Sequence, residues 1–152
     1  MRILHTFICG IFAVAATLLA PSVSAQTVTY THEGTTIKLR KIAIEVGADK
    51  PFSVLHISDS HLAYADERDD SRKQKLANKR IKIFKNPEAT LLAHREYAKE
   101  NGLTIVHTGD MIDFVSEKNL EIAKGIFSEG EWIVCAGNHE YSLYVGEAKE
   151  DA

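Results

Sequence analysis

The chain has 152 residues, of which 45% are hydrophobic and 26% are charged. These values are typical of one globular domain and exclude an intrinsically disordered chain. The formal net charge of −3 is too small to indicate a nucleic acid or an anionic membrane surface as a partner.

The first 25 residues have the composition of a secretory signal peptide. Arg2 precedes an apolar run over residues 7–20, and the small residues Val23-Ser24-Ala25 form a cleavage signature. The run is too short to span a membrane, so we prefer cleavage to a retained N-terminal anchor. Cleavage removes Arg2 and no acidic residue, which changes the net charge from −3 to −4. We therefore expect a mature domain over residues 26–152 that is secreted or periplasmic, without a stable membrane anchor; the oligomeric state has no signal in the sequence.

The first half of the mature chain begins with two predicted strands. Residues 27–46 are rich in β-branched residues, and His32-Glu33-Gly34 forms a turn between two alternating segments. The alternation of apolar residues changes phase after Leu39, which predicts a bulge near Arg40-Lys41. Residues 53–58 then predict the first core strand.

A charge-dense segment over residues 66–85 follows. A nucleic-acid groove and a solvated helix or loop face both explain it, and we favour the second because Phe84 is its only aromatic residue. A few of the cations are expected to flank a site and attract phosphate. Seven of them follow Arg68: Arg72, Lys73, Lys75, Lys79, Arg80, Lys82 and Lys85.

The second half alternates helices and strands. Helices are predicted over residues 87–101 and 116–127, and core strands over residues 103–108 and 132–136. With the strand at 53–58, this order predicts parallel neighbouring strands with right-handed crossovers. The mature chain has one cysteine, Cys135, which excludes a disulfide-held fold and is expected to be a small buried hydrophobic residue.

Each core strand ends in a cluster of polar residues. The three clusters are Asp59-Ser60-His61, Gly109-Asp110 with Asp113, and Gly137-Asn138-His139-Glu140. Residues at the carboxyl ends of parallel strands face a common ligand crevice. Carboxylate, amide and imidazole groups suit divalent metal ions, and glycines before Asp110 and Asn138 permit a tight backbone.

Together these clusters resemble the motifs of the calcineurin-like metallophosphoesterase family, over about residues 53 to 145. The resemblance implies an α/β fold, here an incomplete four-layer α/β/β/α sandwich with the site at the strand ends. It implies a dinuclear centre of two divalent ions, Mn, Fe or Zn, where a metal-activated water attacks the phosphorus of a small phosphate-ester substrate. The implied metal ligands are Asp59, His61, Asp110 (bridging) and Asn138, whereas His139 is catalytic beside the metals and Asp113 orients its imidazole.

Two other histidines, His56 and His107, each stand three residues before one of these carboxylates. Their strand phase differs from that of the carboxylates, so they are expected to point to the other face of the sheet with a structural role. A supporting role behind the metal ligands stays open.

The sequence departs from the family pattern after His139, because no later histidine and no Gly-His-x-His element follows. The chain is then a fragment of a longer protein, binds one metal weakly, or is completed by a partner chain; we favour the fragment. The leading function is a secreted phosphoric-ester hydrolase. The alternative is a catalytically inactive exported binding module with the same fold.

Overall fold

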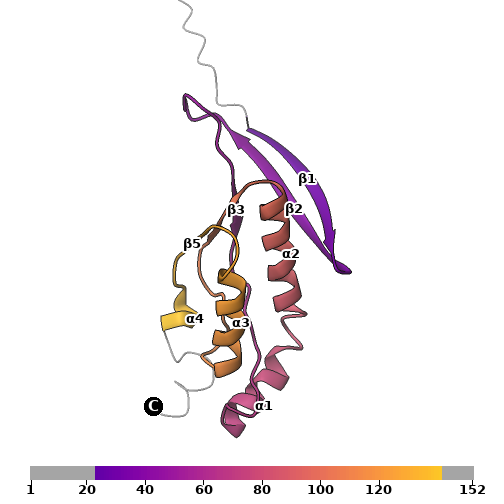
Figure 1. Cartoon of the computed structure of the whole chain (residues 1–152), viewed down its shortest axis with the longest axis vertical. Helices are drawn as coiled ribbons and strands as arrows, with labels where there is room; N and C mark the ends of the chain where they lie inside the picture. The colour runs from indigo at the N-terminus through magenta and orange to yellow at the C-terminus, as the bar shows by residue number, and fades with distance from the viewer. Residues whose placement is uncertain (1–22, 142–152) are drawn as a thin grey trace, which may run out of the picture.

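A β-hairpin opens the part of the chain that the computed structural model describes, residues 23–141 (Figure 1). Strand β1 (Val23–His32) pairs antiparallel with β2 (Thr35–Ile44) across a Glu33-Gly34 turn. Both turn residues have positive φ, 45° and 78°, as a type I′ hairpin turn requires. The predicted pair of strands is confirmed. Residues 1–22 of the predicted signal peptide lie outside the described residues, so the signal peptide stays a prediction.

The bulge predicted near Arg40-Lys41 is wrong. The strands pair without interruption from Val23 opposite Ile44 to His32 opposite Thr35. The hairpin packs on helix α2 (Pro87–Glu100) near Ile37, which is buried, whereas Ile42 and Ile44 are exposed. At that end of the hairpin every residue from 41 to 46 is exposed. The apolar residues there pack against no core, so their change of phase requires no bulge and the strand pairing stays regular.

A three-stranded parallel sheet forms the centre, in the order β3 (Val54–Ile57), β4 (Thr104–His107), β5 (Trp132–Val134). Leu55, Ile105 and Trp132 are neighbours in register and pack with Tyr97 and Ala98 of α2. The predicted α/β arrangement with parallel strands is confirmed. The described residues contain this one sheet and the hairpin, so the four-layer sandwich stays a prediction.

Helices α2 and α3 (Glu117–Phe127) lie side by side in Figure 1 and pack on each other. Pro87 begins α2 at a first-turn position, where its missing N–H costs no hydrogen bond. Ser116 caps α3 by accepting a hydrogen bond from the Asn119 N–H at 3.0 Å. Both predicted helices are confirmed. None of the helices in residues 23–141 is long and apolar enough to cross a lipid bilayer.

The apolar side chains of α3 are only partly buried. The buried ones, Ile122, Ala123 and Ile126, join a core cluster with Leu91 of α2 and with Leu62, Met111 and Ile112 from the loops after β3 and β4. Leu120 and Phe127 are exposed, although the Phe127 ring meets the edge of Trp132 at 5.2 Å. The core therefore lies directly beneath the loops that carry the motifs.

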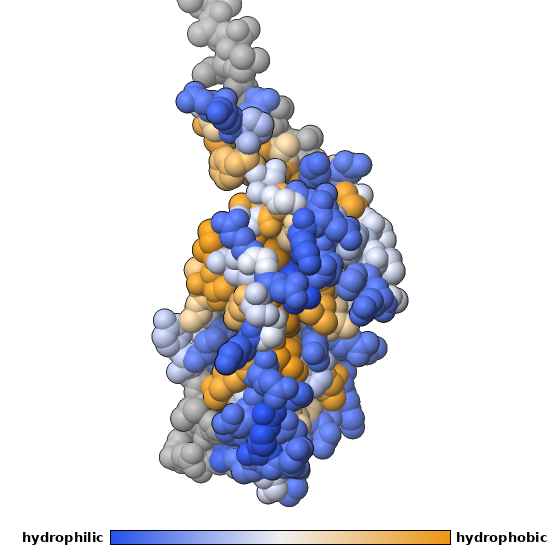
Figure 2. Space-filling view, in the orientation of Figure 1, coloured by the Kyte–Doolittle hydropathy of each residue, from blue (hydrophilic) through white to orange (hydrophobic). Residues whose placement is uncertain are grey.

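The charge-dense segment contains helix α1 (Ser71–Arg80), which Asp70 caps by accepting hydrogen bonds from the N–H groups of Arg72 and Lys73. Figure 2 shows hydrophilic surface gathered at the end of the molecule that α1 occupies. In α1 only Ser71, Lys75, Asn78 and Lys79 are exposed; Ala77 is buried and the other residues are half-buried, so the interpretation of the segment as a solvated face stays a prediction.

Cys135 was expected to be buried, and this expectation is wrong, because the structure shows an exposed free thiol. Within the described residues, strand β5 is one of the two edge strands of the sheet and ends at Val134, so Cys135 is one residue past the strand. Its N–H still donates to the His107 carbonyl at 2.9 Å, but its side chain has no buried face to occupy.

Candidate metal centre

The loops after β3 and β4 run side by side past the ends of their strands. The Asp59 N–H donates to the Gly109 carbonyl and the His61 N–H donates to the Asp110 carbonyl, both at 3.0 Å. These pairings bring two of the motifs together through main-chain contacts. Asp59, His61 and Asp110 all have left-handed backbones, with φ of 55°, 48° and 55°. Such conformations are uncommon for non-glycine residues and cluster at functional sites.

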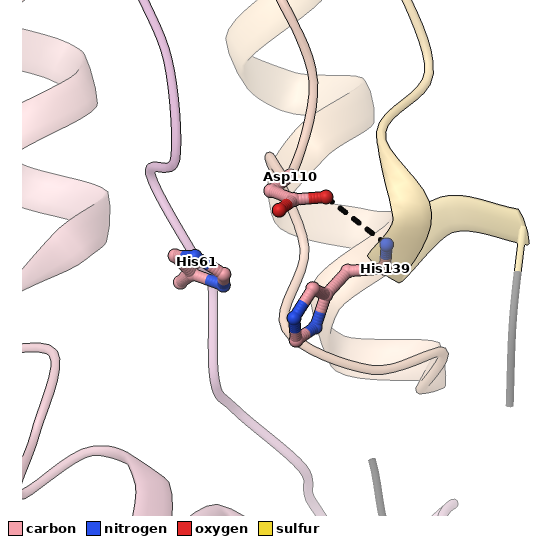
Figure 3. Close-up of side chains that lie close together, drawn as sticks. All are labelled: His61, Asp110 and His139. Carbon is pink, nitrogen blue, oxygen red and sulfur yellow. Dashed lines mark hydrogen bonds between the residues drawn. The ribbon is translucent and has the colours of Figure 1, made fainter. Parts of the chain in front are cut away.

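Three side chains from separate segments converge at this point. His61, Asp110 and His139 each present a ligand atom within 4.8 Å of the other two, and Figure 3 shows them facing a common space. Two atoms that bind one ion at about 2.1 Å each lie at most about 4.2 Å apart. A small inward movement of these side chains therefore suffices to hold one ion.

Asp59 borders this cluster, with its Oδ1 atom 3.8 Å from Nε2 of His61. That separation also fits two ligands of one ion. Its side chain is 64% exposed, and the Ser58 hydroxyl donates to its other oxygen. Asn138 is the exposed first residue of helix α4 (Asn138–Tyr141), directly before His139. The structure thus places Asp59 beside His61, and the predicted ligand roles of both Asp59 and Asn138 stay predictions.

Asp113 lies between the two imidazoles, but its contacts differ from the expected ones. Nδ1 of His139 is 2.7 Å from the main-chain carbonyl of Asp113 and 3.5 Å from its carboxylate. The carbonyl can only accept, so it holds a proton on Nδ1 and leaves Nε2 as the basic atom of the neutral ring. Nδ1 of His61 is 3.2 Å from the same carboxylate without forming a hydrogen bond.

The carboxylate of Asp113 belongs instead to Arg80, which the sequence did not single out. Nε and Nη2 of Arg80 donate to its two oxygens at 2.5 and 2.6 Å. The Asp113 side chain is fully buried, and this bidentate pair raises the pKa of Arg80. Phe84 lies nearby, 5.0 Å below the guanidinium, and stacks on the His61 ring at 4.3 Å. The turn that follows α1 thereby restrains the His61 ring through Phe84.

Glu140 is a second residue whose role the sequence did not reveal. Its carboxylate accepts hydrogen bonds from the N–H groups of Gly137, Asp110 and Ile112, at 2.6, 2.8 and 3.1 Å. One side chain therefore joins the loop after β5 to the loop after β4. Its place in the Gly-Asn-His-Glu motif was the only available signal.

The two glycines before Asp110 and Asn138 are needed for close approach, as the sequence indicated. Gly109 has φ of 111°, and a Cβ atom there would lie 2.6 Å from the Gly137 Cα. A Cβ atom on Gly137 would overlap the carboxylate of Asp110. In the same contact region the His139 N–H donates to Oδ1 of Asp110 at 3.0 Å, the bond drawn in Figure 3.

His56 and His107 were expected to share one face of the sheet, and this is wrong. His107 stands opposite Ile57 in register and His56 opposite Val106, so the two rings lie on opposite faces. His56 is exposed beside the Thr108 hydroxyl. His107 is fully buried: its Nδ1 accepts from the Gly109 N–H at 3.2 Å, so Nε2 carries the proton and donates to the Ser60 hydroxyl at 2.9 Å. His107 therefore supports both loops.

Burial lowers the pKa of His107 and of His94 below the ordinary value of about 6.5. The unfolded chain then binds more protons than the folded one below pH 6.5, so the free energy of unfolding is expected to fall as the pH drops from about 7 towards 5. The variant His107→Gln keeps a donor and an acceptor but does not titrate. Urea unfolding of this variant should show a smaller decrease over that pH range than the parent, and an equal decrease would contradict the assignment.

The comparisons with known proteins agree with this geometry. The family profile described as calcineurin-like phosphoesterase matches residues 52–151, which include all the site residues described above. No curated protein and no solved structure gives a significant match to the chain.

Proposed function

Because the chain belongs to the calcineurin-like phosphoesterase family, we propose that it is an exported, metal-dependent hydrolase of small phosphate esters with a dinuclear centre. The observation that carries the proposal is the convergence of His61, Asp110 and His139 from three separate segments of the matched region. Bound divalent ions supply positive charge for the phosphoryl oxygens and activate a water nucleophile. Export rests on the composition of residues 1–25 alone.

Different residues of the protein would bind the ions, donate the proton and hold these groups in position. Asp59, His61, Asp110 and Asn138 would hold the ions. His139, protonated on both nitrogens, would donate a proton from Nε2 to the leaving oxygen while the Asp113 carbonyl keeps Nδ1–H in place. Arg80 compensates the charge of Asp113, and Phe84 restrains the His61 ring by stacking on it.

The first experiment decides between a hydrolase and an inactive binding module. The purified chain is loaded separately with manganese, iron or zinc, and metal content is measured together with hydrolysis of 4-nitrophenyl phosphate and bis(4-nitrophenyl) phosphate. Hydrolysis that Asp110→Asn abolishes supports the enzyme. Metal content near zero together with no turnover supports the module, and the number of ions bound per chain tests the dinuclear centre.

The variants His139→Ala and Asp110→Ala should separate catalysis from metal binding. Because general acid catalysis contributes about 10²–10⁴-fold, His139→Ala is expected to lower kcat by that factor while the metal content stays near the parent value. Asp110→Ala is expected to lower both quantities. Metal analysis and steady-state kinetics of the two variants, with His32→Ala on the distant hairpin as control, provide the measurement. Equal metal loss in both variants would instead make His139 a ligand, as its place within 4.8 Å of His61 and Asp110 allows.

A further inference from the structure

A cavity of about 300 Å³ adjoins the candidate metal centre. The loop after β3 forms one wall through Asp59, and the segment between α1 and α2 forms the other through Phe84 and Lys85, together with His94 of α2. The volume is at the lower end of the range for small-molecule pockets. The cavity is therefore large enough for part of a small organic molecule.

Two residues connect this cavity to the centre. Asp59 lines it and also lies 3.8 Å from the His61 ring nitrogen Nε2. Phe84 lines it and stacks on His61 with ring centroids 4.3 Å apart. A phosphate ester bound at the centre would thus have the cavity next to its phosphorus, in a place where the organic group of the ester can lie.

The chemistry of the walls indicates what kind of group fits. Ile57, Phe84 and Pro87 provide apolar surface, whereas Lys85 is the only lysine or arginine that lines the cavity among the described residues. Lys85 is exposed and forms no ion pair with another residue of the described chain, 23–141. Burial keeps the His94 pKa low, and its Nδ1 lies 2.8 Å from the Thr90 carbonyl, so this ring adds no charge near pH 7. An unpaired cation beside apolar walls favours an organic group that carries an anion.

We propose that this cavity is a subsite for the leaving group of the ester, and that Lys85 selects substrates whose organic part carries a second anionic group. The proposal rests on the proposed phosphoesterase function and adds its substrate class: phosphate monoesters of an apolar, preferably planar alcohol with a carboxylate or a further phosphate. A metal ion at Asp59 would remove the one competing negative charge on the cavity wall, which leaves Lys85 available to the substrate.

The test compares two esters that differ by one carboxylate, phenyl phosphate and 4-carboxyphenyl phosphate. The measured quantity is the ratio of kcat/KM for the carboxylated ester to kcat/KM for the plain ester. This ratio is expected to be about three- to fivefold higher in the parent than in Lys85→Ala, and the difference should arise in KM. Lys85→Glu should reduce the ratio by about tenfold relative to the parent, and higher salt should shrink the difference. Lys82→Ala, an exposed lysine that does not line the cavity, is the matched control and should leave the ratio unchanged. A ratio that is equal in the parent, Lys85→Ala and Lys85→Glu would overturn the subsite while leaving the hydrolase intact.

A binding measurement separates failure of the subsite from failure of the hydrolase. If the metal-loaded parent cleaves neither ester, the proposed function fails, and 4-phosphonobenzoate and phenylphosphonate are then titrated while amide NMR shifts are followed. Tighter binding of 4-phosphonobenzoate, with shifts at Lys85 and His94 that Lys85→Ala removes, supports the subsite without hydrolysis. Equal affinity for the two phosphonates, or binding of neither, overturns it.

Discussion

Replacing Glu140 with alanine is expected to reduce both the stability and the activity of this protein strongly. Its carboxylate accepts three main-chain hydrogen bonds, from Gly137, Asp110 and Ile112. Hydrogen bonds to a charged group contribute about 1.5–3 kcal/mol each, and losing one partner leaves the N–H donors unpaired. Because such contributions are not additive, we expect the free energy of unfolding to fall by about 3–5 kcal/mol in total.

The same substitution should lower metal content and turnover, because the bonds of Glu140 hold the backbone of Asp110 next to His139. Urea unfolding monitored by Trp132 fluorescence, together with metal analysis, measures both effects. Glu140→Gln keeps one accepting oxygen and should fall between the parent and Glu140→Ala. Glu121→Ala removes an exposed carboxylate paired with Arg68 and Lys118, and should reduce the free energy of unfolding far less than Glu140→Ala does. Equal losses in Glu140→Ala and Glu121→Ala would show that Glu140 does not join the loops.

Arg80→Met is expected to have the second large effect, of about 3–5 kcal/mol in the free energy of unfolding. The Asp113 side chain is fully buried, and Arg80 is the residue that binds both of its oxygens. Removing one partner of a buried ion pair leaves an uncompensated charge in a poorly solvated place, which costs far more than the pair itself contributes. Urea unfolding of the single variants Arg80→Met and Asp113→Asn and of the double variant gives the coupling energy.

In this cycle the double variant should be more stable than Arg80→Met alone, because it no longer contains the buried charge. An additive result, with the two single losses simply combined, would contradict the coupling. Arg68→Met is the control, since its side chain is 45% exposed and its ion pairs with Asp66 and Glu121 are screened by water. We expect that substitution to reduce the free energy of unfolding far less than Arg80→Met does.

The two residues with the largest expected effects were not predicted from the sequence, although the segments that contain them were. Arg80 is one of seven cations between residues 72 and 85, and nothing in the local pattern separates it from its neighbours. Only the path of the chain places it on Asp113, 33 positions away. Glu140 likewise satisfies N–H groups of a different loop, so its role depends on how two strand ends meet.

Short sequence patterns determined the order of the helices and strands and the types of residue in the candidate site. Helices over residues 87–100 and 117–127, the parallel strands and the three polar clusters follow from apolar periodicity, from Pro87 and Ser116 at helix starts, and from polar residues placed after apolar runs. These signals span a few residues, and the backbone responds to them directly through hydrogen bonding and capping. The family and the set of candidate ligands could be predicted from the sequence because their motifs also span only a few residues.

The tertiary structure decided which side chains interact with one another and which are buried. The exposure of Cys135, the unbroken pairing of the hairpin past Lys41, and the opposite directions of His56 and His107 all depend on what lies across from each residue. The assignment of the Asp113 carboxylate to Arg80, with only its carbonyl left for His139, depends on it too. The sequence shows which charged and polar groups will need a partner, because burying an unpaired charge or N–H group costs free energy at any position in the fold. Which of several equivalent groups meets that need is determined only when distant segments pack, since the distance between side chains is a property of the whole fold.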